Sequence, residues 1–336
     1  GTRRTIESHY PPEKVMFLES FQLFFKEDFE ACRLKMEDYL RISPADPPAH
    51  FLAGQASFHL SRWKQAIESF DQVLKMNPYH VPARLYRALG WQIQGNFGKA
   101  IADYGSLRKM DLDAIGPEYP MSREQLQAVT WLAEGLSRYL TATFSPLIDI
   151  KQRQAGWENI LKVVDKSIEL DPDNYLAFYF RARVLLLLDR NDEAVAAADG
   201  SIKIHPGFAN THHARGGANY NRKPRTPESM QRAEEDFTRA LAIYPGYHAS
   251  LALRSAVRWG LNKPDEAASD AIDAIKAMPD GADADLACNI LRYASSKVTD
   301  VAGLRRQLIE AEPFYLKSRR LWVLKGVEAV LNFRLG

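Results

Sequence analysis

Seven prolines recur at a nearly constant interval along this chain of 336 residues. Their successive separations are 34, 94, 34, 39, 34 and 34 residues. The prolines are Pro44, Pro78, Pro172, Pro206, Pro245, Pro279 and Pro313. Because a fixed period of this size is typical of stacked repeats, the spacing predicts a solenoid rather than a single globular core.

Each period has room for two short helices. In the segment 47–80, the residues Ala49 to Leu60 and Lys64 to Met76 each have the pattern of an amphipathic helix. Proline cannot continue a helix and disfavours the α conformation in the residue before it, so Asn77-Pro78 predicts a helix end. Such a helix pair cannot bury its apolar faces alone, and stacking on neighbouring copies would bury them.

Small and aromatic residues recur at fixed places within the period, and they predict where helices approach closely. The eighth place carries Gly54, Ala88, Gly135, Ala182 and Gly216. The twentieth place carries Ala66, Ala100, Ala194, Ala233 and Ala267. The twenty-fourth place carries Phe70, Tyr104 and Phe237, which would fill the space beside the small residues.

In these places and in its prolines, the chain resembles the tetratricopeptide repeat family. The resemblance implies an all-α, right-handed α-solenoid of about eight helix-turn-helix repeats plus a C-terminal capping helix. We expect a tail at 1–12, a single solenoid over 13–336, and repeats near 13–46, 47–80, 81–114, 128–174, 175–208, 209–247, 248–281 and 282–315. The predicted capping helix is Leu316 to Leu335, whose solvated side would carry Lys317, Arg319, Arg320 and Lys325.

The resemblance also implies a concave groove lined by the first helix of each repeat, through its second, fifth, ninth, twelfth and thirteenth places. The groove residues expected to bind a partner are Phe17, Phe21, Phe51, Phe58, Tyr139, Tyr179, Arg183, Asn210, His213, Tyr220, Asn221, Trp259 and Tyr293. Aromatic side chains dominate binding hot spots, although any one of these rings could instead belong to the packing between repeats.

One subset could form a carboxylate pocket, since Arg183 is followed in the next repeat by Asn210 and His213. Relatives that hold the acidic tails of chaperones use a clamp of lysine, asparagine and arginine. Apolar residues and a glutamine occupy those places here: Phe17, Phe21, Phe51, Gln55, Leu85 and Leu89. Chaperone tails are therefore not expected as partners.

Three insertions interrupt the period. Residues 109–122 separate the third and fourth repeats, and the apolar segment Thr143 to Ile150 lies within the fourth. The latter could fold over the stack or serve as a docking site for a partner, through Phe144, Leu147, Ile148 and Ile150. Arg222 to Glu228 adds three positive charges to the sixth repeat; a solvated loop is favoured there over an anion site.

Composition narrows the function classes. The net charge is +2, which gives no electrostatic case for nucleic acid, and no apolar run approaches the ~20 residues of a membrane span. Cys32 and Cys288 are interpreted as two small buried residues, in keeping with a reducing compartment. The cytoplasm is favoured, and the start at Gly1 leaves an upstream targeting segment open.

Neither an enzyme nor a cofactor or metal site is predicted. The glycines Gly216 and Gly217 do not lie between a strand and a helix, so they do not predict a phosphate loop. Adjacent His212 and His213 would point about 100° apart on a helix, unlike a metal-binding pair. The leading expectation is an adaptor that holds a peptide or helix of an unidentified partner. The alternative is a structural subunit of a permanent assembly, built through the convex face, the insertions or the terminal helix.

Overall fold

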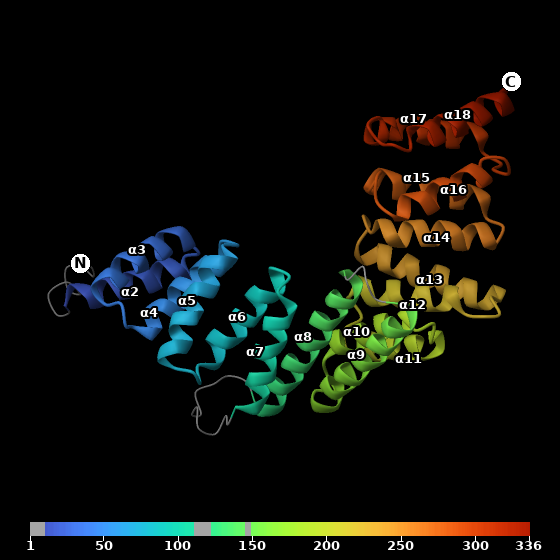
Figure 1. Ribbon diagram of the computed structural model, residues 1–336. Coiled ribbons are helices and arrows are strands. Elements are labelled where there is room, and N and C mark those ends of the chain that lie inside the picture. Colours follow the sequence, from blue (N-terminus) through green and yellow to red (C-terminus); the bar gives the residue numbers. More distant parts are fainter. Residues whose placement is uncertain (1–10, 111–121, 145–148) are drawn as a thin grey trace. The chain divides into compact units, whose positions relative to one another are not determined.

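The computed structural model describes residues 11–110, 122–144 and 149–336, which form seventeen helices and no strand (Figure 1). Two compact halves make up the chain, residues 1–172 and residues 173–336. The N-terminal half contains α2 (Pro12–Phe25), α3 (Phe29–Ile42), α4 (Pro47–His59), α5 (Trp63–Met76), α6 (Val81–Ile93), α7 (Phe97–Lys109), α8 (Arg123–Phe144) and α9 (Ile150–Leu170).

The C-terminal half contains α10 (Tyr175–Leu187), α11 (Asn191–Ile204), α12 (Ala209–Asn221), α13 (Pro227–Ile243), α14 (His248–Gly260), α15 (Pro264–Ala277), α16 (Asp283–Ala294), α17 (Val301–Tyr315) and α18 (Leu321–Leu335). In each half the helices pack against their neighbours along the chain, and α17 and α18 pack on α15 and α16 (Figure 1). The predicted all-α fold of repeated helix pairs with a terminal helix is confirmed.

At six of the seven sites a helix ends just before the proline of the series. The helices α3, α5, α9, α11, α13 and α15 each end two residues before a proline of the series. The seventh site differs, because Pro313 lies inside α17. The helix continues for two residues past it and ends at the buried Tyr315, whose hydroxyl donates to the carbonyl of Leu308 at 2.8 Å.

The terminal helix begins at Leu321, five residues later than predicted. It buries Leu324, Val327 and Leu331 in the core shared with the eighth repeat, so it caps that repeat as expected. The prediction that Arg320 is solvated is wrong, because only 4% of it is exposed. Its guanidinium donates to the carbonyls of Pro279 and Gly281 and pairs with Asp285, and these partners take the place of water.

Helices α8 and α9 of the fourth repeat contain the two ends of the apolar insertion 143–150. Phe144 ends α8 and Ile150 begins α9. The predicted packing of this segment falls on Leu147, Ile148 and the side chains of Phe144 and Ile150, all of which lie outside the described residues. The same holds for most of the insertion at 109–122.

The insertion in the sixth repeat folds onto its own neighbours. Arg222 pairs with Asp192 at 2.7 Å, and Lys223 pairs with Asp189 at 3.0 Å. Thr226 begins α13 with a capping box, in which its hydroxyl accepts from the backbone of Ser229. Two of the three positive charges are therefore neutralised by the preceding repeat.

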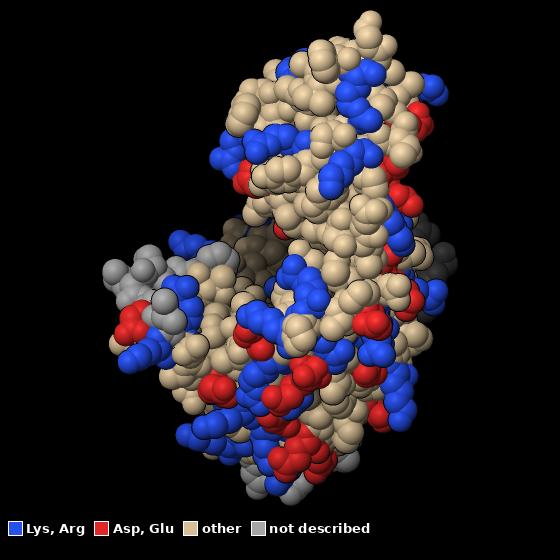
Figure 2. All heavy atoms as spheres, turned by 90° about the vertical axis from the view of Figure 1, so that its right-hand side faces the viewer, with Lys and Arg blue, Asp and Glu red and all other residues tan. Residues whose placement is uncertain are grey.

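Charges of both signs cover the surface, as 44 basic and 42 acidic residues require (Figure 2). No helix of the described residues is both long and apolar enough to cross a bilayer. Cys32 and Cys288 are buried free thiols, as predicted, and burial raises the pKa of each to about 11.

The close approach predicted at the eighth place is confirmed by the space around two glycines. A Cβ on Gly54 would lie 2.6 Å from the ring of Phe70, and a Cβ on Gly216 would lie 2.9 Å from the ring of Phe237. Both rings are fully buried. The first helix of each of these repeats therefore rests directly on the aromatic residue at the twenty-fourth place of the second.

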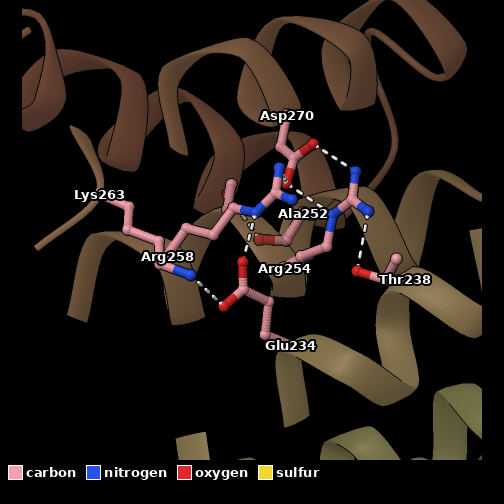
Figure 3. A network of polar contacts seen from close by, with 8 residues as sticks. Glu234, Thr238, Ala252, Arg254, Arg258, Lys263 and Asp270 are labelled. Atoms are coloured by element: carbon pink, nitrogen blue, oxygen red, sulfur yellow. Dashed lines mark hydrogen bonds and ion pairs between the residues drawn. The ribbon is translucent and has the colours of Figure 1, made fainter. Parts of the chain in front are cut away.

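A recurrent arginine, which the sequence analysis missed, joins neighbouring repeats. Arg254 donates to Asp270 of its own repeat at 2.8 Å and 2.7 Å and to Thr238 of the preceding repeat at 3.1 Å (Figure 3). The bond from Arg254 to Thr238 joins α14 to α13. Asp270 also accepts from Arg258, which with Lys263 holds Glu234 of the preceding repeat.

The same arrangement occurs twice more. Arg215 donates to Asp236 of its own repeat and, at 2.7 Å, to Asp199 of the preceding one. Arg87 likewise donates to Asp103 and, at 2.7 Å, to Asp71. The arginines share the seventh place and the first acceptors share the twenty-third, so counting charged residues by place would have found this bridge.

Turns between the two helices of a repeat share one unusual conformation. The fifteenth place has a positive φ of 56–76° in five repeats. The residues there are Glu27, Ser61, Gly95, Asp189 and Asn262. Since only one of them is glycine, sequence alone gives no sign of the left-handed turn.

Substitution of two adjacent glycines of α12 by alanine should change the free energy of unfolding in opposite directions. Gly216→Ala forces a Cβ against buried Phe237 and should lower the free energy of unfolding by ~1–3 kcal/mol. Gly217→Ala meets nothing within 4 Å and should raise it by up to ~1 kcal/mol through helix propensity. Urea unfolding followed by circular dichroism measures both, and equal effects would contradict the close contact.

Removal of the two acceptors of Arg215 should also have unequal effects. Asp236 has 5% of its side chain exposed, so Asp236→Ala leaves a partly buried cation and Asn219 short of an acceptor, at ~3 kcal/mol. Asp199 is 54% exposed, and Asp199→Ala should cost no more than ~1 kcal/mol. Equal losses in the same unfolding assay would show that the bridge to the preceding repeat matters as much as the buried pair.

Candidate partner-binding surface

The first helices of the C-terminal half form one continuous surface. Helix α10 contacts α12, α12 contacts α14, and α14 contacts α16, besides the contacts that each makes with its own second helix. Eight of the predicted groove residues lie on these helices: Tyr179, Arg183, Asn210, His213, Tyr220, Asn221, Trp259 and Tyr293.

The first group of these residues gathers around His213. Its Nδ1 lies 2.8 Å from the hydroxyl of Ser250, and its ring packs at 4.7 Å on Tyr247. Burial, helped by the nearby Arg183 guanidinium, lowers the pKa of His213 to about 4. At neutral pH the imidazole is therefore uncharged. The sequence analysis missed Tyr247 and Ser250, since Tyr247 precedes α14 and a serine carries no signal of its own.

Arg183 lies beside this group, and the carboxylate of Asp283 also lies near it. One of its Nη atoms lies 3.5 Å from the hydroxyl of Tyr179, whose ring meets Phe208 edge-on at 5.2 Å. Asp283 lies close enough to raise the pKa of His213 against the larger effect of burial, and it accepts from His248 at 3.1 Å.

That acid bears on the predicted carboxylate pocket. Asn210, the third predicted member, is half-buried on α12. Arg183 and Asp283 act with opposite sign on His213 and Tyr247, so a carboxylate ligand there would meet an acid as well as a cation, and the pocket stays a prediction.

The second group is a line of rings at the twelfth place, which we call the ring row: Tyr220, Trp259 and Tyr293. Trp259 and Tyr293 stack with their ring centroids 6.4 Å apart. Tyr220 and Trp259 pack against the same buried cluster, which includes Ala256 and Ile290. Tyr293 is 52% exposed, whereas the other two rings are half-buried. The repeat period therefore does bring these three predicted residues together.

Each ring of the row has a cation over it. The Arg225 Cζ lies 4.1 Å from the Tyr220 centroid, the Lys297 Nζ 5.1 Å from that of Trp259, and the Arg292 Cζ 5.3 Å from that of Tyr293. Arg225 is one of the three positive charges noted in the insertion 222–228, whereas Arg292 and Lys297 were not expected here, because the places of the period assigned to the groove do not include them. Asn221, the neighbour of Tyr220, is exposed, and its carbonyl accepts from Asn191 at 3.4 Å.

In the N-terminal half, two of the predicted groove rings take part in packing between repeats. Phe51 and Phe58 lie 6.0 Å and 5.3 Å from Tyr86, which stacks on the buried Phe70. Tyr86 occupies the sixth place of its repeat, which the analysis did not assign to the groove.

The remaining rings of that half are partly covered as well. Phe17 lies between Phe21 and Tyr39, at 5.6 Å and 5.7 Å, and Phe21 is 40% exposed. Tyr139 packs at 5.3 Å on the buried Trp157 of its own repeat. Of the five predicted residues of this half, Phe21 is therefore exposed and the other four are half-buried against neighbouring rings.

No cluster of metal-ligating side chains is found among residues 11–110, 122–144 and 149–336.

Comparison with known proteins agrees with the geometry. A family model described as tetratricopeptide repeat matches residues 160–207. The chain is similar to a tetratricopeptide repeat protein from Parabacteroides merdae, with a TM-score of 0.55, 16% identity, and 84% of this chain and 98% of that chain covered. No curated protein matches the chain.

Weaker similarities are to a thermophilic repeat protein of Thermus thermophilus and to YrrB, which is described as a repeat protein with an unusual peptide-binding site. The first has 18% identity, a TM-score of 0.44, and coverage of 65% of this chain and 100% of that one. The second has 14% identity, a TM-score of 0.42, and coverage of 64% and 95%.

The period, the paired helices and the small residues packed on rings are all similar to those of tetratricopeptide repeat proteins, and residues 160–207 match the model of that family.

Proposed function

We propose that the chain is a non-enzymatic adaptor, which holds a peptide or helix of a partner protein on the first helices of its C-terminal half. Tetratricopeptide repeats generally mediate protein–protein interaction. The observation that carries the proposal is the ring row, in which Trp259 and Tyr293 are stacked and Tyr293 is half exposed. Open aromatic surface that is fixed by packing binds at low entropic cost.

The rest of the surface suits the same role. His213 lies on α12, which carries Tyr220 of the ring row, and Tyr179 and Arg183 lie on the neighbouring α10; hydrogen bonds orient their polar atoms. Such fixed polar groups beside rings select the orientation of a bound segment. The N-terminal half, where Phe51 and Phe58 are used in packing, contributes less to the proposed contact.

A structural subunit is the second candidate, and the terminal helices favour it. Helix α18 exposes Trp322 by 72% and Phe333 by 88%, and Phe314 of α17 is 57% exposed. Large apolar groups on the open end of a stack are typical of an interface between chains. The two candidates use different surfaces, so substitutions separate them.

Loss of the exposed ring should release the partner. Tagged protein captures partners from the native extract, and Tyr293→Glu should reduce the recovery of a specific partner at least about tenfold, because it puts a charge into a hot spot. The matched control is Tyr79→Glu, which changes a 65% exposed tyrosine outside the surface. Partners kept by both variants would contradict the adaptor on this surface.

Substitution of the terminal helix tests the second candidate. Under the adaptor proposal, light scattering should give the monomer mass of 38.1 kDa for the wild type, and Trp322→Ser with Phe333→Ser should leave both mass and partner capture unchanged. A multiple of that mass that falls to the monomer value in the double variant would instead establish a homo-oligomeric subunit. Partners lost only from this variant would indicate a hetero-assembly.

A further inference from the structure

Three positive charges stand over the ring row, one for each ring. They come from different segments: Arg225 from the loop before α13, Arg292 from α16, and Lys297 from the turn after it. All three are exposed. The row therefore combines apolar ring surface with cations that are already oriented.

These cations differ from the arginines elsewhere in the C-terminal half. Arg215, Arg254 and Arg320 are bound to aspartates. Among the described residues, neither Arg292 nor Lys297 makes an ion pair, and the Nε of Arg225 donates only to the backbone carbonyl of Tyr220, at 2.9 Å.

The acids nearest to the end of the row are occupied by backbone groups. Asp265 accepts from the N–H groups of Thr299 and Asp300, at 2.9 Å and 3.0 Å. Asp300 in turn caps α17 by accepting from Gly303 at 2.8 Å. Arg334 adds a further positive charge at this end, since it donates to the carbonyls of Ser295 and Val298.

In Figure 2 the upper part of the molecule, which holds the last helices of the C-terminal half, shows several basic side chains with few acidic ones between them. A cation that stacks on a ring keeps its N–H groups free at its edge, where a carboxylate can accept from them.

We propose that the ring row binds an acidic segment of a partner protein, whose carboxylates meet Arg225, Arg292 and Lys297 while its apolar side chains cover the rings. This inference rests on the proposed adaptor function and names its ligand class. The spacing suits a peptide: alternate residues of an extended chain are ~6.6 Å apart, and the centroids of Trp259 and Tyr293 are 6.4 Å apart.

A nucleic acid would also meet rings and cations, but this surface favours a peptide. Nucleic acid binding needs a continuous basic track along the backbone, whereas the whole chain has a net charge of +2. A peptide can place its charges opposite the cations alone.

The test is a titration of the full chain followed by fluorescence anisotropy. The probe is a fluorescein-labelled ten-residue peptide of glutamates in which two leucines stand two places apart. We expect binding that weakens as salt is added, and no comparable binding of the same peptide with lysines in place of the glutamates. Failure of the glutamate peptide to bind, or equal binding of both peptides, would overturn the proposal.

Removal of charge locates the contact. Arg292→Gln with Lys297→Gln should weaken the glutamate peptide about tenfold. The matched control is Lys203→Gln with Arg239→Gln, which removes the same charge from exposed sites on the second helices α11 and α13 and should leave the affinity unchanged. Equal losses would mean a general charge effect and contradict the site. Labelled oligouridine is titrated in the same way. If it binds more tightly than the peptide and Arg292→Gln with Lys297→Gln weakens it equally, the ligand is a nucleic acid and the acidic segment is rejected.

Capture from the native extract separates this inference from the adaptor itself. If Tyr293→Glu loses a partner that the Arg292→Gln, Lys297→Gln variant keeps, the adaptor stands and the acidic ligand is rejected. If both variants lose it, both proposals are supported. If neither does, both fail on this surface. Circular dichroism and melting temperature, compared with the wild type, verify that each variant is folded.

Discussion

The contact between a glycine and a buried ring, in the second and the sixth repeat, fixes the distance at which the two helices of these repeats pack. Gly54 on Phe70 and Gly216 on Phe237 leave no room for even a methyl group. Because the first helices are held this close to the second, they also lie beside the first helices of the neighbouring repeats. Residues at one place of the period are thereby aligned from repeat to repeat, and the ring row is one consequence of that alignment.

Packing alone would allow neighbouring repeats to slide, since apolar contacts have little direction. The arginine at the seventh place adds direction, because its guanidinium must meet an aspartate of its own repeat and an acceptor of the preceding one at the same time (Figure 3). Asp236 and Asp270 are buried and hold the arginine within its own repeat, so a shift between repeats would break only its bond to the acceptor of the preceding repeat. That acceptor is exposed in the case of Asp199, so the bridge adds direction at little cost or gain in stability.

The parts of this structure that depend on the period could be predicted, and those that depend on local turns could not. Prolines located six helix ends, and the twelfth place located Tyr220, Trp259 and Tyr293. Glu27 and Ser61 adopt a left-handed turn without glycine, which only the geometry of the helix pair imposes. Phe51 and Phe58 share their pattern with groove residues, but a neighbouring Tyr86 fills the space in front of them. The fold was therefore more predictable than the site.

The group around His213 and the ring row differ in their local charge, and this difference argues that they have different roles. At the fifth and ninth places Arg183 is accompanied by Asp283, and burial keeps His213 neutral, so the local charge is balanced. At the twelfth place the cations that cover Tyr220 and Trp259 come from a loop and a turn, outside the places that pack the repeats. Changes in these segments can alter the charge offered to a partner without disturbing the core. Specificity for a partner would then depend on the loop and the turn beside the twelfth place, whereas the stability of the fold depends on the packing between repeats.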